Sequence, residues 1–223
     1  MSEVITIDGP TSSGKSSVGH LFSANIGFQF IDTGAIYRAG SLFILENNLS
    51  TADENVCAKV FENLNVEFKE IDGSQRIFLD GKDITEKLHL PQVTKVVPII
   101  AAFPKVRELS KKIQRKIGSL QNTVMTGRDI GTEIFPDSKL KIFLTASPEI
   151  RAKRRYEQLK QKDLDISYEK VLEEMLKRDE ADSIREASPF RKPDDAVEID
   201  TTNLTTKQTV EKMLELFKAR GLS

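Results

Sequence analysis

The segment GPTSSGKS, from Gly9 to Ser16, most constrains what this chain can fold into. It fits the pattern G-x-x-x-x-G-K-[ST] and lies between a short apolar run, EVITI, and a stretch with helical spacing of apolar residues. A glycine-rich loop in this position turns successive backbone N–H groups toward one centre, where the N-terminus of the helix adds partial positive charge. The segment therefore predicts a phosphate-binding loop after the first strand.

The residues of this loop have separate expected roles. Lys15 supplies a cation for the β- and γ-phosphates of ATP, and the Ser16 hydroxyl is a candidate ligand for Mg²⁺. The glycines do not follow G-x-G-x-x-G, which disfavours a dinucleotide site. The loop expected to bind ATP comprises Gly9, Pro10, Thr11, Ser12, Ser13, Gly14, Lys15, Ser16 and Ser17.

Strand-like and helix-like patterns alternate along most of the chain. Short apolar runs predict strands at residues 3–7, 27–31, 122–127, 140–146 and 196–200. Apolar residues at spacings of three and four predict helices over about residues 14–25, 32–47, 53–64, 104–118, 148–162 and 167–186, and a last one from Val210 to Phe217. Repeated strand–helix units predict an α/β fold with a parallel sheet flanked by helices.

Residues 65–102 do not follow this alternation of strand and helix patterns. Two Asp-Gly pairs, Asp72-Gly73 and Asp80-Gly81, separate short β-like runs. Such pairs are typical of hairpin turns. This region therefore predicts a small antiparallel β insert within the alternating pattern.

Composition limits the class of protein. A chain of 223 residues with 39% hydrophobic residues is long enough for one sizeable core. The formal charge of −1 does not favour a nucleic acid polymer as the main partner. The one cysteine fits a reducing compartment, and the longest apolar run, VVPIIAAF, is too short to span a bilayer. We expect a cytoplasmic monomer that acts on small molecules and not at a membrane.

Arginines follow two of the expected strands. IDTGAIYR places Arg38 on the helix after the second strand, and GRDIGT places Arg128 and Asp129 after the third. The carboxyl ends of parallel strands face the ligand crevice, and a guanidinium pairs with a phosphate in a forked geometry. The alternatives are structural: Thr33 as a helix cap with a surface Arg38, and an ion pair within GRDIGT.

Two charged helices carry further arginines. On the helix LEEMLKRDEADSIREASP, Arg178, Asp182 and Arg185 are spaced to lie on one face, where they could hold a phosphate and a polar group. The helix EIRAKRRYEQL has arginines on one face with no acid between them: Arg151, Arg154 and Arg155. A solvated salt-bridged helix and a surface helix with snorkelling side chains are the respective alternatives.

The remaining motifs narrow the class of nucleotide-binding protein. A GTP switch usually carries Asn-Lys-x-Asp, and a motor ATPase usually has an apolar run that ends in Asp-Glu. The sequence contains no Asn-Lys-x-Asp, and its strand TVMTG ends in Gly-Arg-Asp instead of Asp-Glu. A small phosphotransferase with a second substrate site fits these features better than either class.

Together these segments resemble bacterial cytidylate kinases. The resemblance covers nearly the whole chain, through ITIDGPTSSGKSS, DTGAIYR, AAFPKVR, GRDIGTEIFPD, KIFLTASPEIRAKRRYEQL, RDEADSIREASP and DAVEIDTT. DTGAIYR and GRDIGT are its most specific parts, because the phosphate loop alone is shared by many proteins. The resemblance implies a nucleoside-monophosphate-kinase fold with core segments 1–64, 103–147 and 167–223, a monophosphate-binding insert at 65–102, and a lid at 148–166.

The resemblance also implies roles for particular residues. Binding of CMP is assigned to Thr33, Tyr37, Arg38, Arg107, Arg128, Asp129, Arg178, Asp182 and Arg185. Catalysis is assigned to Lys15, Arg128, Arg178, Arg151 and Arg155. Pro98 stands where many members of the family have a serine near the sugar.

The implied reaction is direct in-line phosphoryl transfer from ATP, with Mg²⁺, to CMP and to dCMP. No general base is required, because the second pKa of a phosphate monoester is about 6 and the attacking oxygen is largely ionised at neutral pH. Three alternatives remain open: a kinase for another nucleoside monophosphate such as UMP, a kinase for a hydroxyl metabolite, and a P-loop binding or regulatory module with slow ATP hydrolysis.

Overall fold

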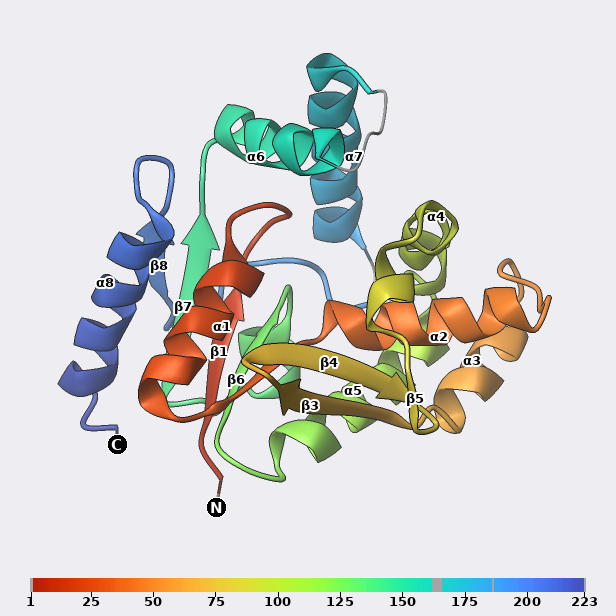
Figure 1. The fold of residues 1–223 in the computed structure, drawn as a ribbon, viewed down its shortest axis with the longest axis horizontal. Helices are drawn as coiled ribbons and strands as arrows, with labels where there is room; N and C mark the ends of the chain where they lie inside the picture. The colour runs from red at the N-terminus through yellow and green to blue at the C-terminus, as the bar shows by residue number, and fades with distance from the viewer. Residues whose placement is uncertain (1, 162–165, 186, 223) are drawn as a thin grey trace. The chain divides into compact units, whose positions relative to one another are not determined.

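A computed structural model describes residues 2–161, 166–185 and 187–222 (Figure 1). The chain divides into two compact units. The first unit combines Met1–Phe30 with Gln121–Ser223, and the second unit is Ile31–Leu120. The second unit is thus longer than the insert expected at 65–102, because it also takes in the flanking helices.

The first unit is built on a parallel sheet with the strand order β2-β6-β1-β7-β8. The strands of the sheet are β1 (Val4–Asp8), β2 (Gln29–Asp32), β6 (Thr123–Gly127), β7 (Leu140–Thr145) and β8 (Val197–Asp200). The division between the units falls within β2, after Phe30. The central strand β1 pairs in parallel with β6 and β7, and β7 pairs in parallel with β8. Because these strands run in one direction, their carboxyl ends lie at one edge, as the alternating pattern predicts. The predicted α/β fold class is confirmed.

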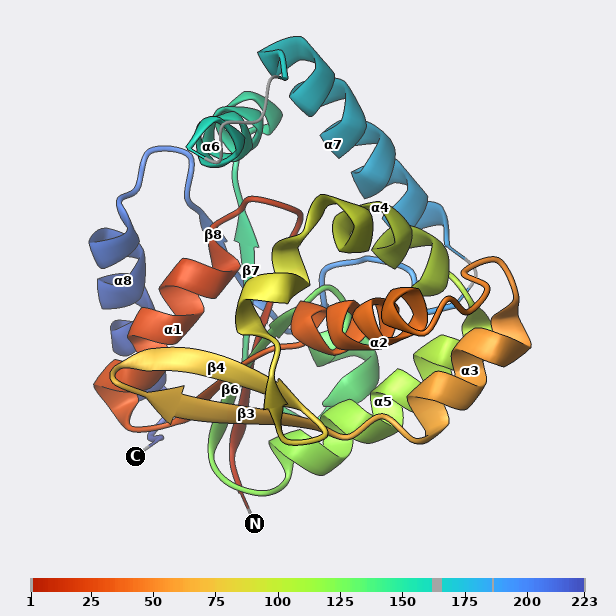
Figure 2. The same ribbon diagram turned by 45° about the vertical axis from the view of Figure 1, so that its right-hand side comes forward.

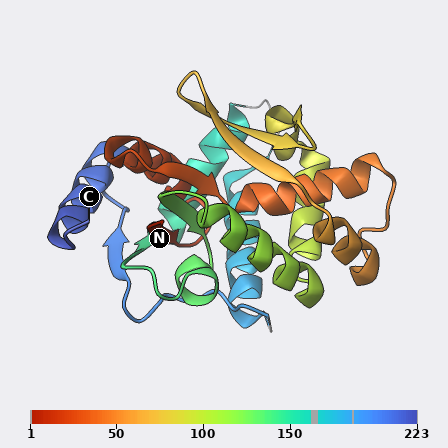
Figure 3. The same cartoon turned by 90° about the horizontal axis from the view of Figure 1, so that it is seen from below.

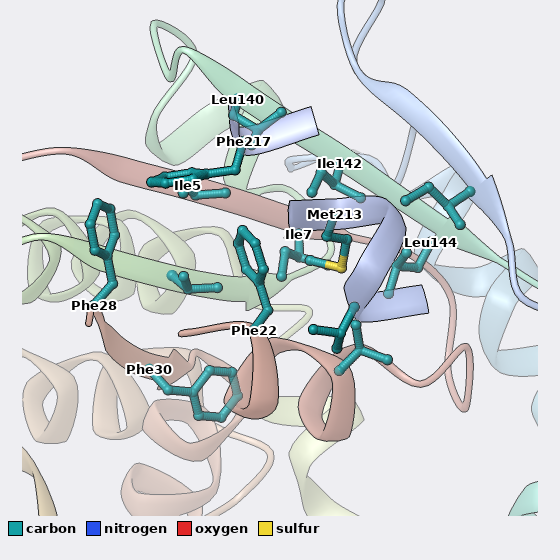
Figure 4. Close-up of a cluster of buried hydrophobic side chains, with 14 residues drawn as sticks. Ile5, Ile7, Phe22, Phe28, Phe30, Leu140, Ile142, Leu144, Met213 and Phe217 are labelled. Atoms are coloured by element: carbon teal, nitrogen blue, oxygen red, sulfur yellow. The ribbon is translucent and has the colours of Figure 1, made fainter. Parts of the chain in front are cut away.

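Two helices cover one face of this sheet. They are α1 (Lys15–Ile26) and α8 (Thr206–Ala219), which lie side by side in Figure 1 and Figure 3. Their apolar residues, including Phe22 and Phe217, pack against alternate residues of β1 and β7, such as Ile7 and Ile142 (Figure 4). This buried cluster fixes α1, and with it the loop that precedes α1, against the end of β1.

Two further helices of the first unit, α6 (Pro148–Lys160) and α7 (Tyr168–Ile184), pack against each other. The Ser147 side chain caps α6 and the Ser167 side chain caps α7, each by accepting a backbone N–H bond. The lid expected at 148–166 includes α6. Residues 162–165 of that segment lie outside the described residues.

The second unit contains the predicted antiparallel patch (Figure 2). Strands β3 (Val66–Ile71), β4 (Ser74–Leu79) and β5 (Lys82–Asp83) form a three-stranded antiparallel sheet. The backbone at both Asp-Gly pairs has positive φ, 52° and 70° at the first pair and 50° and 76° at the second. Both residues of each pair therefore adopt the left-handed conformation that a tight hairpin turn requires.

The remaining elements of the second unit are helical. They are α2 (Gly34–Glu46), α3 (Glu54–Glu62), the short 3₁₀ helix η1 (Thr85–His89), α4 (Pro91–Ile100) and α5 (Pro104–Gly118). Helix α4 has no counterpart among the helices expected from the sequence, and it contains Pro98. Its β-branched residues favour a strand, but buried side chains such as Val93 and Val97 pack α4 against α2. No helix in the described ranges is both long and apolar enough to cross a membrane.

Gly19 provides a test of how tightly α1 packs on the sheet. A Cβ atom at Gly19 would lie 2.8 Å from both Phe30 and Thr126 side chains. Alanine gains about 1 kcal/mol of helix propensity over glycine, but overpacking of a close-packed site costs about 1–3 kcal/mol. We expect Gly19→Ala to lower the free energy of unfolding, measured by urea denaturation. The exposed substitution Asn25→Ala on the same helix is the control, and a more stable Gly19→Ala would show that the contact with Phe30 is loose.

Candidate active site

The phosphate loop is held tightly against the end of β7. A Cβ atom at Gly9 would lie 2.1 Å from the backbone oxygen of Leu144, so only glycine fits there. Gly14 has a φ of 97° and directly precedes α1. The Lys15 ammonium group lies at the start of the loop, where Nζ donates to the carbonyl oxygens of Gly9 and Pro10 at 2.7 Å each. The loop therefore carries its cation beside its own backbone.

A buried carboxylate joins the end of β1 to the turn that follows β6. This turn, η2 (Ile130–Ile134), is a single π-helical turn. Asp8 is fully buried and accepts a hydrogen bond from the backbone N–H of Ile130 at 2.9 Å and from that of Gly131 at 2.7 Å. A Cβ atom at Gly131 would lie 2.9 Å from the Thr6 hydroxyl, so the close approach requires glycine. The segment with Arg128 and Asp129 is thereby fixed beside the phosphate loop.

Burial raises the pKa of Asp8 from its ordinary value of 3.8 to about 6. The two backbone N–H donors, and more weakly Lys15, act in the opposite direction, and the neighbouring Asp129 adds a smaller upward contribution. Asp129 is itself buried, and its backbone oxygen accepts bonds from residues of η2. Both carboxylate oxygens of Asp8 accept hydrogen bonds from the backbone of η2.

Arg128 contacts three other segments of the first unit. Its Nη2 donates to the hydroxyl of Thr11 in the phosphate loop. Its Nε lies 3.0 Å from Asp182 Oδ2, and its Nη1 lies 3.5 Å from Asp179 Oδ1, both on α7. The guanidinium also lies over the ring of Phe190, 5.4 Å from the centroid. The simple ion pair with Asp129 that the sequence left open is thus not the main contact of Arg128.

Arg151 reaches the same loop from α6. It is buried, and its guanidinium donates to the backbone oxygens of Ala146 and Thr11, at 3.1 and 3.3 Å. It also forms an ion pair with Asp179 of α7. The acid that was missing from its own helix face therefore comes from the neighbouring helix.

The other two arginines of α6 have different surroundings. Arg154 donates to the hydroxyl and the backbone oxygen of Thr201, at 3.0 and 2.7 Å. The Thr201 hydroxyl in turn donates to the carbonyl oxygens of Ser13 and Thr145. Arg155 is half-buried, and burial lowers the pKa of its guanidinium. Arg151 is the member of this group that contacts the phosphate loop directly.

Arg178 and Asp182 lie on α7, which ends at Ile184, two residues before the expected end of this helix, and Arg185 directly follows it. Arg185 donates to Asp182 at 3.3 Å and to the backbone oxygens of Ala187 and Ser188. Asp182 and Arg185 therefore contact each other, as their spacing predicts.

Asp179 is a residue that the sequence reasoning missed. It directly follows Arg178 and contacts two arginines of other segments. The available signal was its spacing of three from Asp182, which places two acids on one face of α7. The arginines that complete the contact are distant in sequence, so no local pattern identifies them.

The second unit brings together the other predicted CMP residues in two groups. Tyr37 is buried against Phe61, and the Arg107 guanidinium lies over the Tyr37 ring at 5.7 Å. Arg38 donates to the backbone oxygen of Leu88 and to the Thr94 hydroxyl, at 3.3 and 3.2 Å. Each arginine is thus held by contacts within this unit.

Thr33 is buried and precedes α2, as expected of a helix cap. Its side chain makes no capping hydrogen bond to the helix. Thr33 therefore occupies the N-cap position of α2, but its hydroxyl does not act as the cap.

Comparison with known proteins identifies the family. The family model described as cytidylate kinase matches residues 5–219. The chain belongs to the cytidylate kinase family.

Curated relatives support this membership over nearly the full length. The cytidylate kinase of Carboxydothermus hydrogenoformans is 45% identical, with 95% of this chain and 96% of the relative covered. That of Caldanaerobacter subterraneus subsp. tengcongensis is 46% identical, with 96% and 94% covered, and that of Bacillus subtilis is 42% identical, with 97% of each covered. The resemblance read from the motifs is therefore confirmed.

Solved structures agree on the fold. A shikimate kinase from Acinetobacter baumannii, solved with shikimate, aligns with a TM-score of 0.51 at 16% identity and covers 100% of this chain and 97% of its own. This likeness concerns the fold alone.

The buried Asp8 leads to a prediction about pH. The folded chain binds a proton at Asp8 up to about pH 6, whereas the unfolded chain releases it near pH 3.8. The folded state therefore binds more protons between these values, and its stability falls as the pH rises through that window. We expect the free energy of unfolding of the wild type, relative to Asp8→Asn, to fall by about 2.4 kcal/mol from pH 4 to pH 7.

Urea denaturation at several pH values would measure this difference. Asp53→Asn is the matched control, because Asp53 also accepts two backbone N–H bonds, from Asn55 and Val56, but at an exposed helix start. A relative stability that rises with pH would mean that the donors at Ile130 and Gly131 outweigh burial.

Proposed function

We propose that this member of the cytidylate kinase family transfers the γ-phosphoryl group of ATP directly to CMP, and also to dCMP. The observation that carries the proposal is the contact of Arg128 and Arg151, from two distant segments, with Thr11 of the phosphate loop. Phosphoryl transfer brings together anionic substrates, and fixed cations offset their repulsion and the charge of the transition state. A loop that only binds a nucleotide has no need of such arginines.

Lys15 and Arg151 are assigned to the donor. Lys15 lies within the loop, and Arg151 is anchored to its backbone. Both groups are assigned to neutralise charge on the transferring phosphoryl group. Arg155 is assigned to the same function as a member of the lid, and Ser12, Ser13 and Ser17 are assigned to the phosphates of ATP as members of the loop.

The family resemblance assigns CMP binding to Thr33, Tyr37, Arg38, Arg107, Arg128, Asp129, Arg178, Asp182 and Arg185. Arg38 and Arg128 are assigned to the acceptor phosphate, for which they supply forked donors, and Arg178 and Asp182 are assigned to that phosphate and the sugar. The cytosine base is assigned to Thr33, Arg107, Asp129 and Arg185. The acceptor oxygen is already ionised at neutral pH, so no step requires a general base.

The residues of this site fit a Mg²⁺ ion that is bound mainly through the phosphates of the nucleotide. The described residues contain no group of three or more His, Cys, Asp or Glu side chains that could hold a metal ion, and Asp8 uses both oxygens on η2. A Mg²⁺ ion that keeps several waters and binds substrate phosphates needs few protein ligands. The Ser16 hydroxyl is the residue assigned to it, and the ion would offset phosphate charge.

The proposal also includes the cellular compartment, the partners and the oligomeric state of the enzyme. A formal charge of −1 and a single, buried cysteine support a cytoplasmic enzyme with small-molecule partners and without nucleic acid or membrane. We expect a monomer, which gel filtration would test.

Substitution of Lys15 tests the donor assignment. We expect Lys15→Met to lower kcat by about 10²–10³-fold, the usual effect of losing one preorganised transition-state donor. Steady-state kinetics of ADP release measure this effect. Lys212→Met, on the exposed side of α8, is the control and should retain full activity. Near-normal turnover of a folded Lys15→Met would contradict the phosphate-loop assignment.

Substitutions of Asp129 and Arg185 test the acceptor assignment. We expect Asp129→Ala and Arg185→Ala each to raise the KM for CMP by about tenfold or more, because each loses a hydrogen bond to a charged group. The KM for ATP should change much less. Arg191→Ala, at an exposed arginine of the same segment, is the control. An unchanged KM for CMP in both variants would remove these residues from the acceptor site.

A panel of acceptors separates the remaining functions. ADP release is measured with ATP and each of CMP, dCMP, UMP, AMP, GMP and dTMP. Stimulation by CMP and dCMP alone supports the proposal, and preferential stimulation by UMP supports the nearest alternative kinase. ATP turnover that no nucleotide changes would favour a binding or regulatory module.

A further inference from the structure

Asp179 of α7 contacts two arginines that come from different segments. Its carboxylate forms an ion pair with Arg151 of α6, and its Oδ1 lies 3.5 Å from Nη1 of Arg128, which follows β6. All three side chains are mostly buried, with exposed fractions of 16%, 7% and 15% for Asp179, Arg151 and Arg128. One carboxylate is therefore shared between two guanidinium groups.

The same two arginines meet again at the phosphate loop. Arg128 donates to the Thr11 hydroxyl, and Arg151 donates to the Thr11 backbone oxygen at 3.3 Å. Asp179, Arg128, Thr11 and Arg151 thus form a closed ring of polar contacts. The ring ties α6, α7 and the end of β6 to the loop.

The buried charges of Arg151 and Arg128 require the negative charge of the Asp179 carboxylate. An arginine in a protein does not lose its proton, so a buried guanidinium must be compensated by an anion or return to water. Arg151 and Arg128 are like charges that converge on one residue, and they repel each other. Without Asp179, the nearest compensation for Arg151 would be neutral carbonyl oxygens, which are weaker acceptors than a carboxylate.

We propose that Asp179 is a positioning residue for phosphoryl transfer, which holds Arg151 and Arg128 together in the orientation that both substrates require. The inference rests on the proposed roles of these arginines, Arg151 toward ATP and Arg128 toward CMP. Asp179 acts through the two guanidinium groups and not on a substrate. Loss of its charge should therefore affect both substrates at once.

Asp182 provides the internal comparison. It lies on the same helix and contacts Arg128 at 3.0 Å and Arg185 at 3.3 Å. Among the ion pairs of the described residues, Asp179 and not Asp182 joins Arg151. A change at Asp182 should therefore weaken the use of CMP and leave the use of ATP nearly unchanged.

The experiment compares Asp179→Asn, Asp182→Asn and Glu180→Gln by steady-state kinetics with ATP and CMP. Glu180 is the matched control, because it is an exposed acid next to Asp179 on the same helix. We expect Asp179→Asn to lower kcat by about 10–100-fold and to raise the KM for both substrates, as for the loss of hydrogen bonds between charged groups. Asp182→Asn should raise only the KM for CMP, and Glu180→Gln should change nothing.

Asp179→Glu adds a rescue test. It keeps the charge, so it should recover part of the kcat lost in Asp179→Asn, with kcat calculated per folded molecule from thermal melts. Constants within twofold of the wild type in Asp179→Asn would overturn the inference. So would a misfolded Asp179→Asn beside an Asp179→Glu with wild-type constants, because that result indicates a role in folding alone.

Substitution of the arginines separates this inference from the proposed function. If Arg128→Ala and Arg151→Ala leave kcat and both KM values unchanged, the proposed function is wrong. If they change these constants and Asp179→Asn does not, the inference alone is wrong. The double variant Asp179→Asn with Arg151→Ala should lose less than the product of the two single losses, because Asp179 acts partly through Arg151.

Discussion

The buried Asp8 carboxylate is the interaction on which the rest of the candidate site depends. It stands at the end of the central strand β1, directly before the phosphate loop, and binds the backbone of Ile130 and Gly131 through both oxygens. Two peptide N–H groups offset part of the cost of burying its charge. The result is that the loop and the Arg128 turn, which are more than a hundred residues apart in sequence, share one anchor. The contact of Arg128 with Thr11 lies between the two segments that this anchor joins.

Carboxylates in the first unit thus have a structural use that differs from general acid–base catalysis. Asp8 holds a backbone turn, and Asp179 and Asp182 hold guanidinium groups. A phosphate acceptor removes the need for a base, so these acids are available to orient cations instead. The same logic explains how Arg128 and Arg151 can be buried: each has a carboxylate partner on α7 within the protein itself.

The fold was largely predictable because its signals are local. The phosphate loop, the strand–helix alternation and the Asp-Gly turns each occupy a few consecutive residues, and backbone sterics determine their conformation. Helix α4 could not be predicted in this way. Its β-branched residues and Pro98 argue against a helix, and packing against α2 outweighs that preference.

The site was predictable in its residue types but not in its partners. The sequence identified Arg128 and Arg151 because they follow a strand end and line a helix face, and both contact the phosphate loop. It did not identify Asp179, because the spacing of three from Asp182 places two acids on one face of a charged helix but does not show which arginines they contact. The charge balance of a buried guanidinium is a property of three-dimensional packing. Arginine-rich sites of this kind therefore need the structure to show which carboxylates hold the cations and which bind solvent.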